Sequence, residues 1–333
     1  MGWTGVVLWR GERLDAEEIT RFARRVEDAG LASLWVPETW VRDAGIQLAL
    51  AAQATRTLRL GAGILNIYGR SPGFLAQTAA ELDVLSGGRF ILGIGVSGRA
   101  VIEGWHAQPF RRPLQRTRET LAALRQAFAG ERVEAEGEFL RMRGFRLRRG
   151  PVQERVPIYL AANGPRNTRL AGELADGWIP FLIPFSRFRE AMAPLAEGAR
   201  AAGRAPGAVD AAPFIYFSPG EDLARARERV MPELGFYVGA MGVYYHAQLA
   251  RWGYAGEADR IRAAWGEGGR AAAARAVPDA LVDDLALCGP PSRLAEGLAR
   301  LREAGITHPI LRLPETMEEE EAAAALDLIG KLG

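Results

Sequence analysis

Residues 82–95 read Leu-Asp-Val-Leu-Ser-Gly-Gly-Arg-Phe-Ile-Leu-Gly-Ile-Gly, and this stretch decides the fold class. Before the glycines, Leu75, Leu82 and Leu85 recur at helical spacing, so a helix is expected to end at Gly87-Gly88. After Arg89 the chain is apolar up to Gly95, which is typical of a strand buried on both faces of a parallel sheet. Helix, glycine stop and buried strand together indicate an α/β protein.

The same unit recurs along the whole chain. Helical patterns separate eight short apolar stretches, which are expected to be strands: 5–9, 34–36, 58–65, 89–95, 156–162, 177–181, 211–217 and 309–313. Eight alternating units in 333 residues favour one (β/α)8 TIM barrel over residues 1–333. An open, doubly wound sheet is the alternative, because strand counts from a single sequence are uncertain.

Two segments do not fit the repeating unit. Residues 131–148 alternate between charged and apolar side chains, which predicts a β-hairpin excursion. Residues 236–276 are rich in glycine, tyrosine and tryptophan, and we expect them to form an insertion or a lid.

The composition excludes several classes of chemistry. Of 42 lysines and arginines only Lys331 is a lysine, which argues against a Schiff-base or Walker-A lysine. Cys288 is the single cysteine and the three histidines are scattered, so no metal site is expected. The net charge is +2, without a basic run and without 18 consecutive apolar residues. We therefore expect a cytoplasmic protein that binds neither nucleic acid nor membrane.

In such a barrel the active site lies at the carboxyl ends of the strands. Small residues dominate there, as in 63–66, 95–98 and 162–165, and they allow a large ligand to approach backbone N–H groups. Glu38 is the only carboxylate at a strand end, so the paired acids of a glycosidase are missing. The reactive group is therefore expected to come from a bound small molecule.

Several blocks in this order carry a family resemblance. They are 27–30, 34–38, 60–64, 82–95, 156–165 and 174–178. Through them nearly the whole chain resembles the luciferase-like monooxygenase superfamily, and within it the coenzyme F420-dependent oxidoreductases. The resemblance implies a TIM barrel, F420 bound at the strand ends and a non-prolyl cis peptide at Gly63-Ile64.

The resemblance also implies a set of cofactor-binding residues. They are Glu38, Thr39, Gly61, Gly63, Ile64, Asn66, Gly95, Val96, Ser97, Gly98, Ala162, Asn163, Gly164 and Arg166. Asn66 would bind the polar edge of the ring, and Arg166, with Arg99, would neutralise the phosphate and acidic tail. Other interpretations remain open: Gly61 and Gly63 could serve merely to let a strand bend, and Asn163 could be a turn residue without a cofactor contact.

Glu38 and His106 are the candidate catalytic residues. Glu38 could instead cap a helix or form an ion pair, and His106 could be a solvent-exposed loop residue. F420-dependent sugar-phosphate dehydrogenases carry an Asp-His pair where this chain has Glu38-Thr39. Oxidation of a sugar phosphate is therefore not expected.

The predicted function is hydride transfer between C5 of F420 and an apolar or conjugated small-molecule substrate. One alternative is an FMN-dependent luciferase-like monooxygenase. The other is a barrel that binds a deazaflavin or another ligand without catalysis. The resemblance further implies a homodimer.

Overall fold

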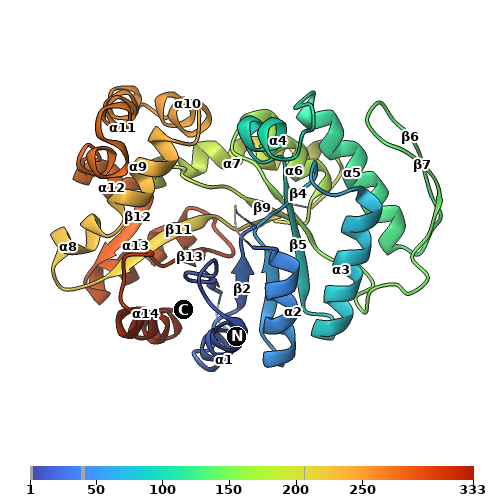
Figure 1. The fold of residues 1–333 in the computed structure, drawn as a ribbon, viewed down its shortest axis with the longest axis horizontal. Coiled ribbons are helices and arrows are strands. Elements are labelled where there is room, and N and C mark those ends of the chain that lie inside the picture. Colours follow the sequence, from blue (N-terminus) through green and yellow to red (C-terminus); the bar gives the residue numbers. More distant parts are fainter. Residues whose placement is uncertain (1–2, 39–41, 206) are drawn as a thin grey trace.

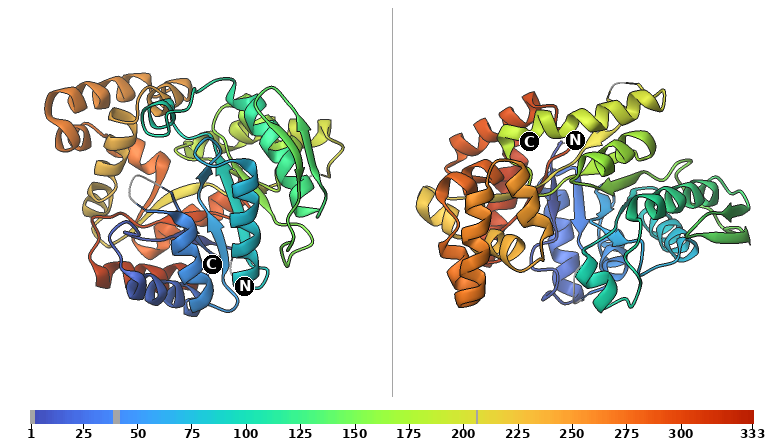
Figure 2. Two further views of the ribbon diagram at one scale, coloured as in Figure 1. Left: turned by 45° about the vertical axis from the view of Figure 1, so that its right-hand side comes forward. Right: turned by 90° about the horizontal axis from the view of Figure 1, so that it is seen from above.

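The computed structural model describes residues 3–38, 42–205 and 207–333, which form a curled sheet surrounded by helices (Figures 1 and 2). In the larger sheet all neighbouring strands run parallel, in the order β10-β9-β8-β5-β3-β2-β1-β13-β11-β12, and β4 pairs with β5. Its strands are β1 (Gly5–Val7), β2 (Ser33–Val36), β3 (Arg59–Ala62), β4 (Leu65–Asn66), β5 (Phe90–Gly95), β8 (Ile158–Ala161), β9 (Gly177–Ile179), β10 (Asp210–Ala211), β11 (Phe214–Pro219), β12 (Ala286–Gly289) and β13 (Ile310–Arg312).

Helices alternate with these strands and cover the outside of the sheet (Figure 1). They are α1 (Ala16–Asp28), α2 (Ala44–Ala54), α3 (Pro72–Ser86), α4 (Arg99–Gly104), α5 (Pro113–Phe128), α6 (Pro165–Leu174), α7 (Phe188–Ala201), α8 (Leu223–Glu228), α9 (Met231–Gly239), α10 (Tyr244–Arg251), α11 (Ala255–Arg275), α12 (Asp279–Leu285), α13 (Pro291–Glu303) and α14 (Glu319–Leu332), with a 3-10 turn at Phe185–Arg187.

Backbone hydrogen bonds connect β9 with the residues that lead from β10 into β11. Ala212 donates to the carbonyl of Trp178 at 2.8 Å, and Phe214 donates to the carbonyl of Pro180 at 3.0 Å. Phe214 then begins β11, which pairs with β13 and so leads back to β1. The sheet curls far enough for the chain after β9 to lie beside the start of β11, where Phe181 and Phe214 form a parallel bridge. The α/β prediction with parallel strands is confirmed.

Every stretch expected to be a strand contains one, but two of them are interrupted. The predicted strand 58–65 is interrupted at Gly63-Ile64, and the predicted strand 211–217 is interrupted at Ala212-Pro213. One further strand was not predicted: α12 ends at Leu285, and Ala286–Gly289 pairs with β11 as β12. Periodicity cannot separate helix from strand in so short an apolar run, so the tertiary pairing decides.

Residues 131–148 contain β6 (Val133–Glu136) and β7 (Arg141–Phe145), which pair antiparallel at one edge of the molecule (Figure 1). Residues 236–276 are largely helical, because they contain the end of α9, then α10 and α11. The aromatic side chains Tyr237 and Tyr245 of this segment contact each other, with ring centroids 5.2 Å apart.

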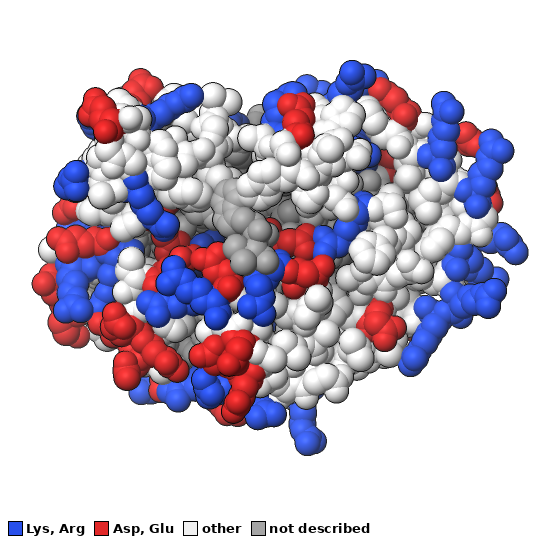
Figure 3. Space-filling view, viewed as in Figure 1, with Lys and Arg blue, Asp and Glu red and all other residues white. Residues whose placement is uncertain are grey.

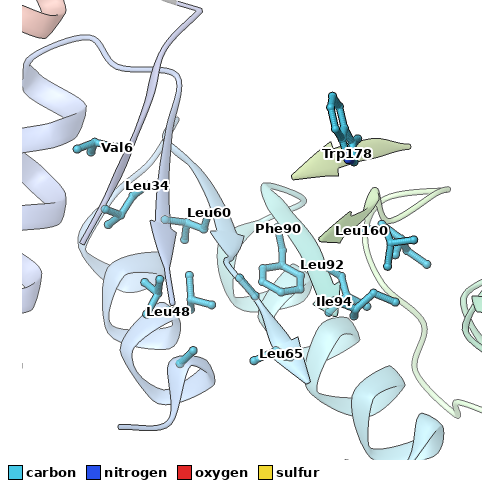
Figure 4. Packing of buried hydrophobic residues seen from close by; sticks show 14 of the residues in the cluster. Val6, Leu34, Leu48, Leu60, Leu65, Phe90, Leu92, Ile94, Leu160 and Trp178 are labelled. Atoms are coloured by element: carbon cyan, nitrogen blue, oxygen red, sulfur yellow. The ribbon is translucent and has the colours of Figure 1, made fainter. Parts of the chain in front are cut away.

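Alternate residues of the strands form two separate cores. Leu34, Leu60, Leu92 and Trp178 belong to one buried cluster, part of which is drawn in Figure 4. The next residue along, for example Trp35 or Ile179, belongs to a second cluster that fills the inside of the curled sheet: Val7, Trp35, Ile91, Tyr159, Ile179, Ala212, Phe214 and Ile310. Because these side chains close the interior, a ligand can enter only above them, at the carboxyl ends of the strands.

The 82–95 block also connects three elements. Asp83, which is fully buried on α3, accepts hydrogen bonds from the backbone of Val152 and Gln153 at 2.7 and 2.9 Å. Arg89 donates to the carbonyls of Leu58, Ala52 and Thr55 at 2.6 to 3.1 Å, which satisfies the end of α2. The polar residues of this block therefore hold α2, α3 and the segment before β8 together.

Candidate active site

Two adjoining cavities open at the carboxyl ends of the strands. The glycine cavity has a volume of about 230 Å³ and contains many of the predicted site residues. It is lined by Pro37, Glu38, Gly63, Ile64, Gly95, Val96, Ser97, Gly98, Ala161, Ala162, Asn163, Ile179, Phe181, Phe214, Tyr237, Met241, Tyr244, Tyr245 and Arg312. Acidic and basic side chains lie side by side along the lower left part of the face shown in Figure 3.

The second cavity, which we call the β1 cavity, follows β1 and has a volume of about 400 Å³. It is lined by Val7, Leu8, Trp9, Arg10, Gly11, Glu12, Pro37, Arg42, Gln47, Glu233, Phe236, Tyr237, Arg270, Arg312, Leu313 and Glu315. Pro37, Tyr237 and Arg312 line both cavities, so the two spaces meet at these side chains. A ring in one cavity would therefore face a second reactant in the other.

Missing side chains shape the glycine cavity. The Gly63-Ile64 peptide is cis, as expected. A Cβ atom on Gly63 would lie 2.5 Å from Cζ of Phe214, and one on Gly95 would lie 3.1 Å from Cδ1 of Ile64. Only glycine fits at 63, and glycine at 95 leaves the floor of the cavity open.

The loop after β5 turns sharply at Ser97, which has a φ of +57°. A non-glycine residue rarely adopts this left-handed conformation, and it is found where surrounding structure enforces it. Gly98 follows as the N-cap of α4 and lines the same cavity. This turn places the Val96-Ser97-Gly98 backbone along the cavity wall.

Glu38 lines the glycine cavity, but its carboxylate forms an ion pair. Both oxygens accept from Arg70, one of them from Nη2 at 2.6 Å. Arg70 also binds Asp43 at 2.9 Å, and only 14% of the Glu38 side chain is exposed. The ion-pair interpretation of Glu38 therefore describes its contacts in this structure.

Asn66 and His106 lie beside the glycine cavity, outside its lining. Oδ1 of Asn66 accepts from the backbone of Tyr68 at 3.1 Å, and Nδ2 lies 3.3 Å from Nε2 of His106. The two predicted residues thus contact each other, Asn66 from the end of β4 and His106 from the loop between α4 and α5.

Asn163 lies inside the glycine cavity. Its Oδ1 accepts from the backbone N–H of Phe181 at 2.8 Å, which connects the loops after β8 and β9. Three other predicted residues do not line the cavity. Gly61 packs against Trp35, and a Cβ atom on Gly61 would lie only 2.3 Å from that ring. Gly164 is the N-cap of α6, and Arg166 is exposed.

The remaining predicted residues add little at this site. Thr39 lies outside the described residues. Arg99 is exposed and forms an ion pair with Glu103 at 2.7 Å.

Among residues 3–38, 42–205 and 207–333, no three His, Cys, Asp or Glu side chains are grouped to hold a metal ion. No helix in the same ranges is long and apolar enough to span a membrane.

A buried charge cluster at the junction of the cavities was missed by the sequence analysis. Nη2 of Arg312 lies 3.2 Å from Oε2 of Glu233 and 3.6 Å from Oε1 of Glu315. Nη1 of Arg312 donates to the hydroxyl of Tyr237 at 3.3 Å. In the sequence, the only pointer to this cluster was Arg312, a charged residue near the end of the otherwise apolar stretch 309–313. The partners on α9 could not be identified without the tertiary structure.

Burial controls the protonation of this cluster. It raises the pKa of Glu233, while Arg312 and the backbone N–H of Glu315 act in the opposite direction. The hydroxyl of Tyr216 is also buried there, and burial raises its pKa well above the usual value, with a further contribution from Glu233. Both groups therefore favour their neutral forms.

The fold and the cavities at its strand ends define the class of protein. The sequence description of the luciferase-like monooxygenase family matches residues 5–308, and the chain belongs to this family.

Individual relatives match over nearly their full length. A Mycobacterium tuberculosis protein named as a coenzyme F420-dependent oxidoreductase is 33% identical, over 90% of this chain and 91% of its own. The 5,10-methylenetetrahydromethanopterin reductase of Methanolobus tindarius is 31% identical, over 94% of both chains. The structure of the coenzyme F420-dependent tetrahydromethanopterin reductase from Methanopyrus kandleri superimposes with a TM-score of 0.86 at 26% identity, over 98% of this chain and 97% of that one.

Proposed function

We propose that the protein is an F420-dependent oxidoreductase that transfers hydride between the cofactor and an apolar or conjugated small-molecule substrate. Relatives named as F420-dependent match this chain over nine-tenths of its length. The reactive group must come from a bound cofactor, because the described residues that line the two cavities include neither cysteine, histidine nor lysine. The proposed fold is a closed (β/α)8 barrel, supported by the hydrogen bonds that the backbone N–H groups of Ala212 and Phe214 donate to the carbonyls of Trp178 and Pro180.

The single observation that carries the proposal is the glycine cavity. Its floor is the Gly63-Ile64 peptide and Gly95, and its wall is the backbone of residues 96–98 and 162–163. Side chains at 63 and 95 would fill this space, as the distances to Phe214 and Ile64 show. A flat ring fits such a glycine-lined cradle, so the residues present suit a deazaflavin.

When bound, reduced F420 supplies a hydride at C5 of its deazaflavin ring. The protein would position the reactants: residues 63–64 and 95 would hold the ring, and the backbone N–H groups near 96–98 and 163 would bind its polar parts. Tyr237, Tyr244 and Tyr245 cover the opposite side and exclude water. Asn66, Gly61, Gly164, Arg166 and Thr39 remain predicted cofactor contacts, and Glu38 and His106 remain predicted catalytic residues.

The segment 236–276 is proposed to act as the lid over this site. α10 carries Tyr244 and Tyr245 into the cavity lining, and Met241 of the preceding turn joins them. In the ribbon views this segment lies beyond the strand ends, across from α4 (Figures 1 and 2).

A titration with F420 and, separately, with FMN tests the cofactor. We expect quenching of F420 fluorescence on binding, and consumption of reduced F420 in the presence of enones or imines. Binding of FMN without F420 would favour the monooxygenase alternative. Binding of F420 without any turnover would favour the non-catalytic barrel.

We also propose that the protein is a homodimer that uses α2 and α3. Ile46 on α2 is 66% exposed and Phe74 on α3 is 54% exposed, although α2 is apolar on nearly all sides. Leu85 and Val152 extend the exposed apolar face at the end of α3. Exposed apolar side chains gathered on neighbouring helices suit an association surface, and a twofold axis would bury them on both copies.

A further inference from the structure

Hydride transfer to a carbonyl, imine or enone also requires a proton, and neither predicted donor is well placed for it. Glu38 is held by Arg70, and His106 lies outside both cavity linings. We propose that Glu233 is the acid that delivers this proton to the substrate in the β1 cavity. This inference rests on the proposed function, because the bound reduced deazaflavin provides the hydride.

Glu233 is buried but faces the cavity. It lies on α9, and 3% of its side chain is exposed, at the wall of the β1 cavity. Tyr237, one turn further along the same helix, lines both cavities. A substrate in the β1 cavity could therefore touch Glu233 and the ring in the glycine cavity at the same time.

The two carboxyl oxygens of Glu233 have different partners. Oε1 accepts from the backbone N–H of Glu315 at 3.0 Å. Oε2 lies 3.2 Å from Nη2 of Arg312, yet it makes no well-formed hydrogen bond, and neither does the neighbouring Tyr216 hydroxyl. Oε2 therefore has an ion-pair partner but no well-formed hydrogen bond, and a buried oxygen in this position is costly. Because Glu233 lines the β1 cavity, we propose that its carboxyl group turns toward the substrate held there, which then provides the acceptor for the proton on Oε2.

The local charges also favour a neutral Glu233. One guanidinium, Arg312, faces two carboxyl groups, Glu233 and Glu315. Glu315 is 27% exposed and is the better site for the negative charge. Burial raises the pKa of Glu233, which shifts this group toward its neutral form. The other ionisable groups around it are Tyr216, Tyr237 and, across the cavity, Arg10, Glu12, Arg42 and Arg270.

The proposed step balances for a conjugated ketone. The hydride from the reduced deazaflavin forms a C–H bond at the β-carbon, and the electron pair of the C=C bond moves onto the carbonyl oxygen. This oxygen takes the proton from Oε2 of Glu233, whose O–H bond breaks. The substrate gains two electrons and the cofactor loses two. Glu233 is left as a carboxylate beside Arg312, and water that enters the cavity reprotonates it.

Infrared spectroscopy of the protein, alone and with F420, tests the protonation directly. At pH 7 we expect the band of a buried carboxylic acid that shifts in D2O. The E233Q variant should lose this band, because its amide has a similar shape but cannot hold the acidic proton. E315Q removes the other carboxyl group that faces Arg312 and serves as the matched control, so it should keep the band. If the wild type lacks the band, or E233Q retains it, the proposal is overturned.

Single-turnover oxidation of reduced F420, with 2-cyclohexen-1-one as the probe, tests the catalytic role. The wild-type rate should fall as the pH rises through the raised pKa of Glu233. E233Q should be about 100-fold slower and should lose this pH dependence, since general acids contribute at least this much. An E233Q variant with wild-type rate and profile overturns the role.

Two further results distinguish the possible causes of failure. If E233Q does not fold, as judged by circular dichroism, E233D should keep the carboxylic acid band at a shifted frequency. If the protein does not bind F420, the proposed function falls and this step loses its reductant. If F420 binds and the band is absent, only the role of Glu233 falls.

Discussion

At the scale of single residues, the site depends on where side chains are missing. Gly95 could carry a Cβ only by displacing Ile64 and Ala161, whose nearest atoms would be 3.1 and 3.2 Å away. All three residues line the glycine cavity. The Gly95→Ala variant should therefore fold but bind F420 about tenfold more weakly, because overpacking costs about 1 to 3 kcal/mol. Fluorescence titration measures the affinity.

Gly104→Ala is the matched control for this variant. Gly104 is exposed at the end of α4, and nothing lies within 4 Å of a Cβ there. Its affinity for F420 should equal that of the wild type. Equal affinities of G95A and the wild type would contradict the proposal that F420 binds in the glycine cavity.

His308 predicts how stability depends on pH. Burial lowers its pKa to about 4, and its Nε2 lies 2.7 Å from Oγ of Ser33. The neutral form is therefore favoured in the folded state. The stabilisation is complete above pH 6.5, the usual value, and is lost as the pH falls through 4. A shift of this size corresponds to about 3 kcal/mol.

Urea unfolding at pH 7 and at pH 4 measures this effect. Between these two values the wild type should lose about 3 kcal/mol more of its unfolding free energy than His308→Gln, which cannot titrate. Parallel losses in both proteins would show that His308 does not control the acid sensitivity.

At the scale of helices and strands, the order of the elements could be predicted but their partners could not. The eight predicted strands were found because buried strands of a parallel sheet are continuously apolar and glycine ends the preceding helices. β12 was missed because Ala286–Gly289 is too short for periodicity to identify it, and it is a strand only through its pairing with β11.

The same reasoning explains which site residues could be predicted. The parallel topology brings strand ends together, so Gly63, Gly95 and Asn163 meet at one cavity. Glu233 comes from α9, a helix within the second half of the chain. No local pattern predicts that α9 would lie against β13, so its contact with Arg312 required the structure.

Arg89 should be essential for the packing of α2 against the sheet. It donates to the carbonyls of Leu58, Thr55, Ala52 and Ser86 and to the hydroxyl of Thr55. Arg89→Met would leave carbonyl groups unsatisfied and should lower the unfolding free energy by about 3 kcal/mol, as measured with urea. Arg143→Met is the control, because Arg143 is 82% exposed on the hairpin and should change stability by less than about 1 kcal/mol. Similar losses in both variants would contradict the packing role.

At the scale of the whole molecule, the proposed dimer predicts a specific way to separate the chains. The exposed Ile46 and Phe74 lie on neighbouring helices, and Gln53 of α2 contacts the Leu85 carbonyl of α3 at 3.5 Å. The two exposed side chains therefore lie on one pair of packed helices. A double variant, Ile46→Glu with Phe74→Glu, would place two carboxylates per chain in the interface and should yield monomers, because burying unpaired charge is strongly unfavourable.

Sedimentation velocity measures the oligomeric state of the three proteins needed for this test. The wild type should sediment as two chains, and the double variant as one chain with an unchanged circular dichroism spectrum. Val243→Glu is the control: Val243 is 64% exposed before α10, on the other half of the molecule from α2 and α3 (Figure 1), so this variant should remain a dimer. The site is lined by residues of one chain, so the monomeric variant should still bind F420. A monomeric wild type would exclude the α2–α3 interface, whereas a double variant that stays dimeric would place the interface on another face.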